Sequence, residues 1–250
     1  NFNFSLAFTD EFMKKAVNEP DTPWICNWEG TPMKPRKITR DEGGRIIEIK
    51  DVDITVGELF DLIVNYSWLN GEPGCIFIDT VNKANPLPGL GRIECCNPCG
   101  EQFLHSGDAC NLGSINLEKF ITPERTIDLE SLKETTKTAV RLLDDVVDLT
   151  HFTVPRVEET FKNNRRIGLG IMGLADALFL LRIPYNSPEG RETARLLMKT
   201  IKEAAHEASR ELGEEKGSFP NKDKSIYSDI PMRNASLTNV APTGSTSMVL

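Results

Sequence analysis

The chain is organised around Arg92-Ile93-Glu94-Cys95-Cys96-Asn97-Pro98-Cys99-Gly100-Glu101-Gln102, and we expect its chemistry to lie in this stretch. The stretch holds three of the six cysteines. If its backbone is extended, alternation places Asn97, Cys99 and Glu101 on one side. The proline and glycine between them disfavour a paired central strand. We therefore predict a loop that presents a carboxamide, a thiol and a carboxylate together.

A short apolar run precedes this loop. Residues 74–79 read GCIFID between turn residues, which is typical of a buried strand. Asparagines, prolines and glycines over residues 82–91 then predict a long loop, and long loops within compact domains are usually functional. The reactive thiol is therefore expected at the tip of a loop that a strand feeds.

The cysteines allow two other interpretations. Cys96 and Cys99 have the spacing of a redox pair, which would indicate a thiol–disulfide oxidoreductase, but no βαβ pattern surrounds them. Cys96, Cys99, His105 and Cys110 offer zinc-type ligands, which would indicate a zinc-stapled, non-catalytic module, but a second C-x-x-C pair is missing. Neither interpretation accounts for the carboxamide and the carboxylate, and we expect no metal site.

A second polar cluster follows the first. Asn97-Pro98-Cys99-Gly100-Glu101-Gln102 precedes Ala109-Cys110-Asn111-Leu112-Gly113-Ser114-Ile115-Asn116-Leu117. Together the two motifs resemble the active-site region of ribonucleotide reductase catalytic chains, and most closely the adenosylcobalamin-dependent class. Further matches extend the resemblance over most of the chain, at residues 1–13, 73–86, 165–178 and 241–250. Cys96 departs from the pattern, since the family more often has a hydroxyl residue there.

The fold class follows from the pattern and is refined by the resemblance. Helices that alternate with short apolar strands indicate an α/β chain. The resemblance implies part of the ten-stranded α/β barrel of ribonucleotide reductases, with the cysteine loop inserted through its centre as a catalytic finger. Residues 1–250 would be one partial barrel domain, with flanking parts missing before Asn1 and after Leu250. Such a fragment, with open strand edges at both ends, is expected to be catalytically silent alone.

The resemblance also implies a reaction, the radical reduction of ribonucleoside diphosphates to 2′-deoxyribonucleotides. A thiyl radical on Cys99 would abstract the 3′-hydrogen of the ribose. Glu101 would act as general base on the 3′-hydroxyl, and Asn97 would hold that hydroxyl or the carboxylate in place. Cys110 would supply reducing equivalents and form a disulfide with a partner cysteine that the family carries upstream.

Cofactor and partners are implied in the same way. Adenosylcobalamin would generate the radical, and a thioredoxin-like protein would restore the thiols. The full-length protein could form a homodimer. One alternative within the family is a large subunit that uses a separate di-metal radical subunit.

Residues 241–247 read APTGSTS, a small and hydroxyl-rich stretch. Its pattern fits either a solvated loop or a cradle of amide and hydroxyl donors for an anion. The resemblance favours the cradle. We therefore expect the substrate phosphates to be bound by five residues: Pro242, Thr243, Gly244, Ser245 and Thr246.

Gly168-x-Gly170-x-x-Gly173 resembles a dinucleotide-binding loop only superficially. Such a loop needs a strand before it and an acidic residue about 20 residues later. Charged residues 162–166 precede it instead. Close packing of backbone against the glycines is the better interpretation. The resemblance to ribonucleotide reductases implies that this stretch is a barrel strand that runs into a helix at residues 174–181.

Helix ends are marked by capping residues. Thr9 is expected to cap a helix from Asp10, and Thr55 and Glu58 form a capping box. Gly71 is placed to end that second helix. Two longer helices are predicted, one from Asp128 or Ser131 to Leu149 and one from the Ser187-Pro188 cap to about Leu212.

Composition excludes other functions. The chain has 29 basic and 37 acidic residues and a net charge of −8, which argues against general nucleic-acid binding. It has no apolar run of about 20 residues, so we expect no membrane span. The crowded cysteines argue against a secreted disulfide framework, and we expect a cytoplasmic protein.

Overall fold

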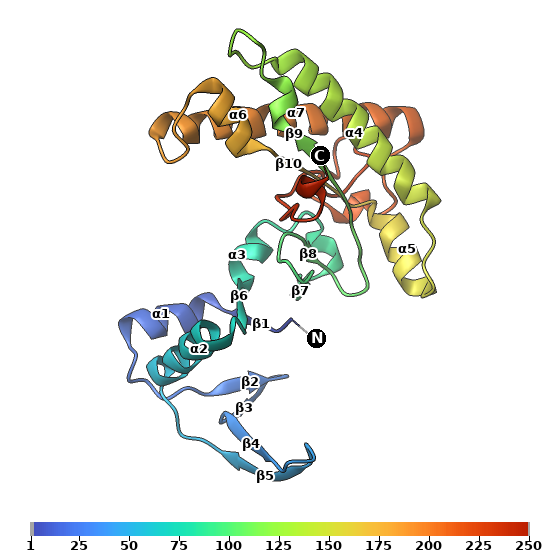
Figure 1. Ribbon diagram of the computed structural model, residues 1–250. Coiled ribbons are helices and arrows are strands. Elements are labelled where there is room, and N and C mark those ends of the chain that lie inside the picture. Colours follow the sequence, from blue (N-terminus) through green and yellow to red (C-terminus); the bar gives the residue numbers. More distant parts are fainter. Residues whose placement is uncertain (1–2, 250) are drawn as a thin grey trace. The chain divides into compact units, whose positions relative to one another are not determined.

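The computed structural model describes residues 3–249, and the chain divides into two compact units, Asn1–Lys83 and Ala84–Leu250 (Figure 1). The elements of the first unit are β1 (Ser5–Phe8), α1 (Asp10–Asn18), β2 (Cys26–Trp28), β3 (Thr31–Met33), β4 (Arg36–Arg40), β5 (Ile46–Asp51), α2 (Val56–Asn70), β6 (Gly74–Phe77) and α3 (Ile78–Lys83).

The first unit packs α1 and α2 around a small core. This core consists of Phe8, Phe12, Val56 and Ile63, and β1 pairs in parallel with β6. The alternation of apolar and polar residues in NFNFSLAF, residues 1–8, predicts a strand, and the structure has that strand from Ser5 to Phe8, while Asn1 and Phe2 lie outside the described residues.

The predicted caps of this unit are confirmed. The Thr9 hydroxyl accepts a hydrogen bond from Phe12 N, and Thr55 and Glu58 form the reciprocal capping box. Gly71 ends α2 with a φ of 81°, in the left-handed region that favours glycine.

The expected buried strand at residues 74–79 is partly wrong. β6 ends at Phe77 and α3 begins at Ile78, so the helix starts where the strand was expected to continue. Within β6 only Ile76 is buried. The apolar run was too short to distinguish a strand from a strand followed by a helix turn.

The second unit holds the cysteine loop. Its elements are η1 (Pro88–Leu90), β7 (Cys95–Cys96), β8 (Phe103–Leu104), β9 (Asn111–Asn116), η2 (Leu117–Phe120), α4 (Leu129–Leu149), α5 (Pro155–Asn164), β10 (Ile167–Met172), α6 (Leu174–Leu181), α7 (Pro188–Lys216), η3 (Lys222–Lys224) and η4 (Thr246–Met248).

A parallel ribbon of β9 and β10 is the centre of this unit, with α4 packed against α7 and against both strands (Figure 1). The buried core includes Leu143 and Val147 of α4, Ile167 and Leu169 of β10, and Ile201 of α7. The chain then returns along β10, where Ile167 N donates to Ser236 O and Leu169 N donates to Leu237 O. This return delivers residues 241–246 to the ribbon.

The close-packing interpretation of the β10 glycines is confirmed. A Cβ added at Gly168 would lie 2.6 Å from Asn239 Nδ2, and one added at Gly170 would lie 2.9 Å from Asn239 O. Side chains at these positions would therefore push the returning chain away. The helix expected at residues 174–181 is α6.

The other helix predictions also hold, with one extension. Asp128 caps α4, and the Ser187 hydroxyl accepts from Gly190 N at the start of α7. α7 continues past Gly213 and ends before Gly217. Gly213 instead provides a close approach, since a Cβ there would lie 2.9 Å from Met232 N.

The α/β class is confirmed, and the barrel is not closed by this chain. The described residues form five two-stranded sheets. No helix among them is both long enough and apolar enough to cross a membrane.

Candidate active site

The cysteine loop is a tight hairpin. β7 and β8 pair in antiparallel fashion, and between them Asn97 N donates to Gln102 O at 3.0 Å. The Asn97 side chain adds a second link, because its Oδ1 accepts from Gln102 N at 3.0 Å. Gly100 has a φ of 79° at the turn and donates its N–H to Asn97 O. The predicted loop is therefore a closed turn with Cys99 exposed at its tip.

A pocket of about 370 Å³ brings two predicted site segments together. Its walls are Cys99 and Glu101 of the hairpin, residues 112–114 of β9, and residues 241–246 of the returning chain. All five residues expected to form the phosphate cradle are walls of this pocket. The thiol and the carboxylate thus share a cavity with the hydroxyl-rich loop, although the loop begins 142 positions after Cys99 and 140 positions after Glu101 (241 minus 99 and 241 minus 101).

Asn97 and Cys110 are not walls of this pocket. The Asn97 carboxamide oxygen is directed to the base of the hairpin, as described above. The prediction that the loop presents Asn97, Cys99 and Glu101 together on one side therefore holds for the thiol and the carboxylate, which share the pocket. The catalytic roles of all four residues stay predictions.

Glu101 has an unsatisfied carboxylate oxygen. Its Oε2 is buried and has no hydrogen-bond partner among the described residues. A buried polar atom without a partner costs free energy comparable to a lost hydrogen bond, so it calls for an explanation. A hydroxyl donor on a ligand in the pocket would supply the missing bond.

The loop over residues 241–246 is open to a ligand. Ser247 N donates to Thr243 O at 2.8 Å, which closes a turn that leads into η4. Thr243 has a φ of 54°. Ser245 and Thr246 are exposed, and a Cβ built on Gly244 meets no atom within 4 Å. This combination suits the close approach of an anion to the backbone.

Cys110 follows the hairpin in the chain and directly precedes β9. Its sulfur accepts a hydrogen bond from Gln102 Nε2 at 3.0 Å, and its S–H group donates to Asn111 O at 3.3 Å. Burial raises the pKa of the Cys110 thiol to about 12, while the Gln102 bond and Arg166 act in the opposite direction. In this state Cys110 is a protonated thiol at neutral pH.

A buried polar network fixes the base of the loop. Arg166 Nε donates to Asp108 Oδ2 at 2.6 Å, and Asn164 Nδ2 donates to the same oxygen at 2.8 Å. Arg166 also lies 3.1 Å from His105 Nδ1, and His105 Nε2 lies 3.1 Å from Gly91 O. Because arginine only donates and a carbonyl only accepts, these two contacts suit the His105 tautomer that carries its proton on Nε2.

Sequence reasoning missed this network. In the sequence Arg165 and Arg166 only mark a charged stretch before the glycine motif, whereas in the structure both are buried. One feature of the sequence could have indicated it. Two arginines directly precede an apolar strand, so they are candidates for burial, and a buried charge needs a charged or hydrogen-bonding partner.

The alternative roles of the cysteines gain no geometric support. All six cysteines are free thiols in the structure. Among the described residues, the one group of three potential ligands within 4.8 Å of one another is Asp144, Asp145 and Asp148, so the four candidate zinc ligands do not converge. These acids already pair with cations: Arg165 and Arg233 with Asp144 and Asp148, and Lys216 with Asp145.

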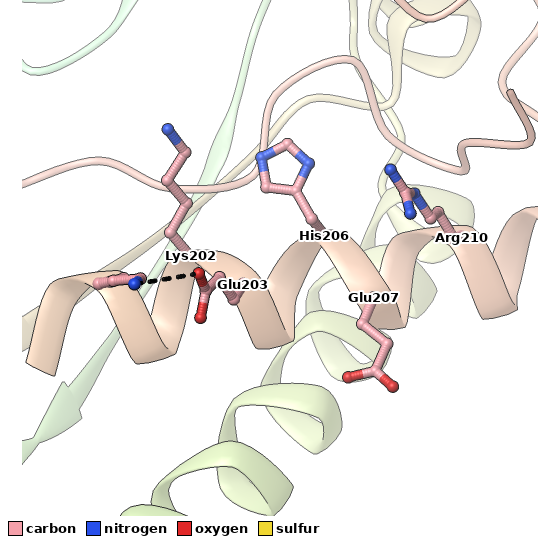
Figure 2. A pocket seen from close by; sticks show the side chains of 6 residues that line it. Lys202, Glu203, His206, Glu207 and Arg210 are labelled. Carbon is pink, nitrogen blue, oxygen red and sulfur yellow. Dashed lines mark ion pairs between the residues drawn. The ribbon is translucent and has the colours of Figure 1, made fainter. Parts of the chain in front are cut away.

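A second hollow, of about 660 Å³, lies along α7 (Figure 2). Six residues of this single helix line it: Lys199, Lys202, Glu203, His206, Glu207 and Arg210. Charges of both signs are mixed there, and Lys199 pairs with Glu203 at 3.8 Å. This is the pattern of a solvated helix face, so its larger volume does not make it the better candidate site.

The chain is similar to known proteins of one kind. A family model described as "Ribonucleotide reductase, barrel domain" matches residues 1–230. The vitamin B12-dependent ribonucleoside-diphosphate reductase of Mycobacterium tuberculosis is 42% identical over 250 residues, which is 100% of this chain and 33% of that protein. The protein of the same name from Thermoplasma acidophilum is 40% identical over 251 residues, 100% of this chain and 30% of that protein.

More distant relatives include a ribonucleoside-diphosphate reductase large subunit of Caenorhabditis elegans. It is 30% identical over 245 residues, which cover 93% of this chain and 30% of that protein. Among solved structures, a class Id ribonucleotide reductase alpha subunit of Actinobacillus ureae superposes with a TM-score of 0.66 and 24% identity, over 78% of this chain and 38% of that one. This chain spans about a third of the length of these curated relatives.

Proposed function

The chain belongs to the ribonucleotide reductase family, and from that premise we propose that it supplies the catalytic hairpin and phosphate cradle of an enzyme that reduces ribonucleoside diphosphates to 2′-deoxyribonucleotides. Residues 1–250 would form one partial catalytic barrel domain. The observation that carries the proposal is the pocket shared by Cys99, Glu101 and residues 242–246. A nucleotide in this pocket would place its ribose beside the thiol and its phosphates in the hydroxyl-rich loop.

The chemistry matches the groups that line the pocket. The 2′ C–O bond of ribose is unactivated, and loss of the 3′-hydrogen to a Cys99 thiyl radical makes departure of the 2′-hydroxyl easier. The unsatisfied Glu101 Oε2 would accept the proton of the 3′-hydroxyl as general base. Asn97 would keep the thiol and the carboxylate in place, because its Oδ1 closes the hairpin by accepting a hydrogen bond from Gln102 N.

Reduction also needs two electrons and two protons. We propose that the Cys110 thiol and a partner cysteine supply them. The substrate C–O bond breaks, water leaves, a C–H bond forms at C2′, and the two thiols become a disulfide. A thioredoxin-like dithiol would then return the disulfide to thiols by exchange.

The relatives named vitamin B12-dependent suggest the cofactor. Adenosylcobalamin supplies radical chemistry when bound. The residues of this chain fit such a group, because the thiol that must become a radical is exposed rather than sealed in the core. The hairpin tip, Pro98 to Gly100, would be the part of this chain that contacts it.

The same catalytic residues would serve a large subunit with a separate di-metal radical subunit, as the similarity to the Caenorhabditis elegans protein illustrates. The higher identity to the B12-dependent reductases favours the cobalamin enzyme. A cytoplasmic location and a homodimer of the full-length protein complete the proposal.

The test is reduction of a ribonucleoside diphosphate by the complete enzyme that contains this chain. With a dithiol present, we expect deoxynucleotide formation that depends on added adenosylcobalamin and needs no second protein. Equal activity without cobalamin, restored by a di-metal protein, would favour the two-subunit alternative. Failure to bind or reduce nucleotide under either condition would refute the proposed function.

A further inference from the structure

Gln102 links the cysteine hairpin, which carries Cys99, to Cys110. The residue is buried, with 8% of its surface exposed. Both backbone polar groups of Gln102 bond to Asn97 on the opposite strand of the hairpin, since its N–H donates to Asn97 Oδ1 and its carbonyl accepts from Asn97 N. Its side chain bonds to Cys110 instead, where Nε2 donates to Sγ at 3.0 Å.

The surroundings of Cys110 make this bond chemically significant. The thiol is buried, which disfavours its charged form. Glu101 and Asp108 face it with negative charge and disfavour the thiolate further, whereas the Arg166 guanidinium favours it. Gln102 is the neutral donor in this set. A hydrogen bond from an amide N–H is stronger to an anionic sulfur than to a neutral thiol, so it favours the thiolate.

A second geometric feature supports a specific function. The S–H group of Cys110 donates to Asn111 O at 3.3 Å, so Gln102 occupies the acceptor side of the sulfur. The Gln102 side chain therefore does not compete with the proton in the thiol state and is already in place when that proton leaves.

We propose that Gln102 is a positioning residue that holds the Cys110 sulfur and favours its thiolate, and so sets the reactivity of Cys110 in thiol–disulfide exchange. The inference rests on the proposed function, in which Cys110 is a redox cysteine. When a dithiol reduces the disulfide between Cys110 and its partner cysteine, one dithiol sulfur attacks the partner's sulfur, and the Cys110 sulfur leaves with the electron pair of the broken bond as a thiolate, which Gln102 Nε2–H stabilises. The second dithiol sulfur then displaces the partner's sulfur, so an S–S bond forms within the dithiol and its two protons pass to the two released thiolates.

The test measures ionisation of Cys110 directly. Iodoacetamide alkylates thiolates, so the alkylation rate of each cysteine, followed by peptide mass spectrometry between pH 7 and 9, reports its thiolate fraction. The variants are Gln102→Met, which keeps the length of the side chain without a donor, and Gln102→Glu, which places a carboxylate at the same position. The exposed Cys75, in the other compact unit, is the internal control.

We expect Cys110 alkylation to slow at least about threefold in Gln102→Met and further in Gln102→Glu. Loss of the amide donor raises the pKa of the thiol, and the thiolate fraction at a given pH falls about tenfold for each unit by which that pKa rises. The Cys75 rate should stay unchanged. Equal or faster alkylation of Cys110 in both variants would overturn the proposal. A variant that merely loosened the fold would expose Cys110 and raise its rate, so the expected direction separates the two effects.

In the complete enzyme, turnover with dithiothreitol as reductant should fall in Gln102→Met while the KM for nucleotide stays the same. A rise in KM with unchanged turnover would also contradict the proposal. Reduction by the wild-type enzyme tests the proposed function itself, so failure of the Gln102 inference can be told apart from failure of that function.

Discussion

Arg166 and Asp108 form a buried ion pair, with 2.6 Å between Nε and Oδ2 and side-chain exposures of 2% and 0%. The pair joins the start of β10 to the turn that separates the cysteine hairpin from Cys110. Arg166 also contacts His105, so one guanidinium fixes two points at the base of the loop. Orientation of the hairpin therefore depends on a residue outside the pocket.

Removal of this guanidinium should be strongly destabilising. In Arg166→Met the Asp108 carboxylate stays buried without its cation, and breaking one side of a buried pair costs about 3–5 kcal/mol. Urea unfolding measures the change. The matched control is Arg141→Met, which breaks the exposed pair with Glu215 and should change the stability far less, because solvent screens that pair. Equal losses in the two variants would show that the buried pair does not anchor the loop.

Acid should weaken the second unit through Asp148. Hydrogen bonds and charge from Arg165 hold the pKa of this carboxyl below its ordinary value. A lowered folded-state pKa contributes stability that is present above the ordinary pKa and is lost as pH falls through the folded-state value. Between pH 5.5 and 3 the urea midpoint should drop, and it should drop less in Asp148→Asn. An identical pH dependence in both proteins would argue against this contribution.

Gly170 should not tolerate a side chain. A Cβ there lies 2.9 Å from Asn239 O, a backbone atom that cannot rotate away. Gly170→Ala should therefore destabilise the unit by about 1–3 kcal/mol and displace the chain that leads to the phosphate cradle. Gly43→Ala is the control, because its nearest neighbour is a carboxylate oxygen of Asp41 at 3.3 Å. Nucleotide affinity should fall in the first variant only, and unchanged affinity in Gly170→Ala would contradict this.

The phosphate cradle can be tested by charge. Ser245→Glu places a carboxylate at the exposed loop of the pocket, where it would repel a diphosphate. Affinity for a ribonucleoside diphosphate, measured by calorimetry with the complete enzyme, should fall more than about tenfold, or about 1.4 kcal/mol. Ser228→Glu adds the same charge at an exposed position that is not a wall of the pocket and should leave affinity unchanged. Similar affinities in both variants would remove residues 242–246 from the binding site.

Local signals predicted much of the fold. Thr9, Thr55 and Ser187 cap helices where their hydroxyls were expected to, because capping depends on a few neighbouring residues. The glycine motif of β10 predicts close packing, and in the structure Asn239 packs against Gly168 and Gly170. Helix α5 was missed because its N-cap is Val154, which offers no side-chain hydrogen bond.

In the site too, the parts that depend on a local motif could be predicted, and the parts that depend on distant residues could not. The motif predicted a loop that presents Cys99 and Glu101, and the structure places both in one pocket with residues 242–246. Strand β9 was not predicted, because Asn111, Ser114 and Asn116 interrupt its apolar alternation. Contacts between distant residues, such as Arg166 with Asp108, depend on the tertiary fold and leave no periodic signal.

The most direct test of the account is Cys99→Ser in the complete enzyme, with Cys75→Ser as the matched control outside the pocket. A hydroxyl cannot replace the thiol as the radical site, so deoxynucleotide formation should disappear while affinity for the ribonucleoside diphosphate stays within about twofold, or about 0.4 kcal/mol. Cys75→Ser should retain full turnover and affinity. Substantial turnover by Cys99→Ser would contradict the assignment of Cys99 and, with it, the central claim that this hairpin carries the reaction.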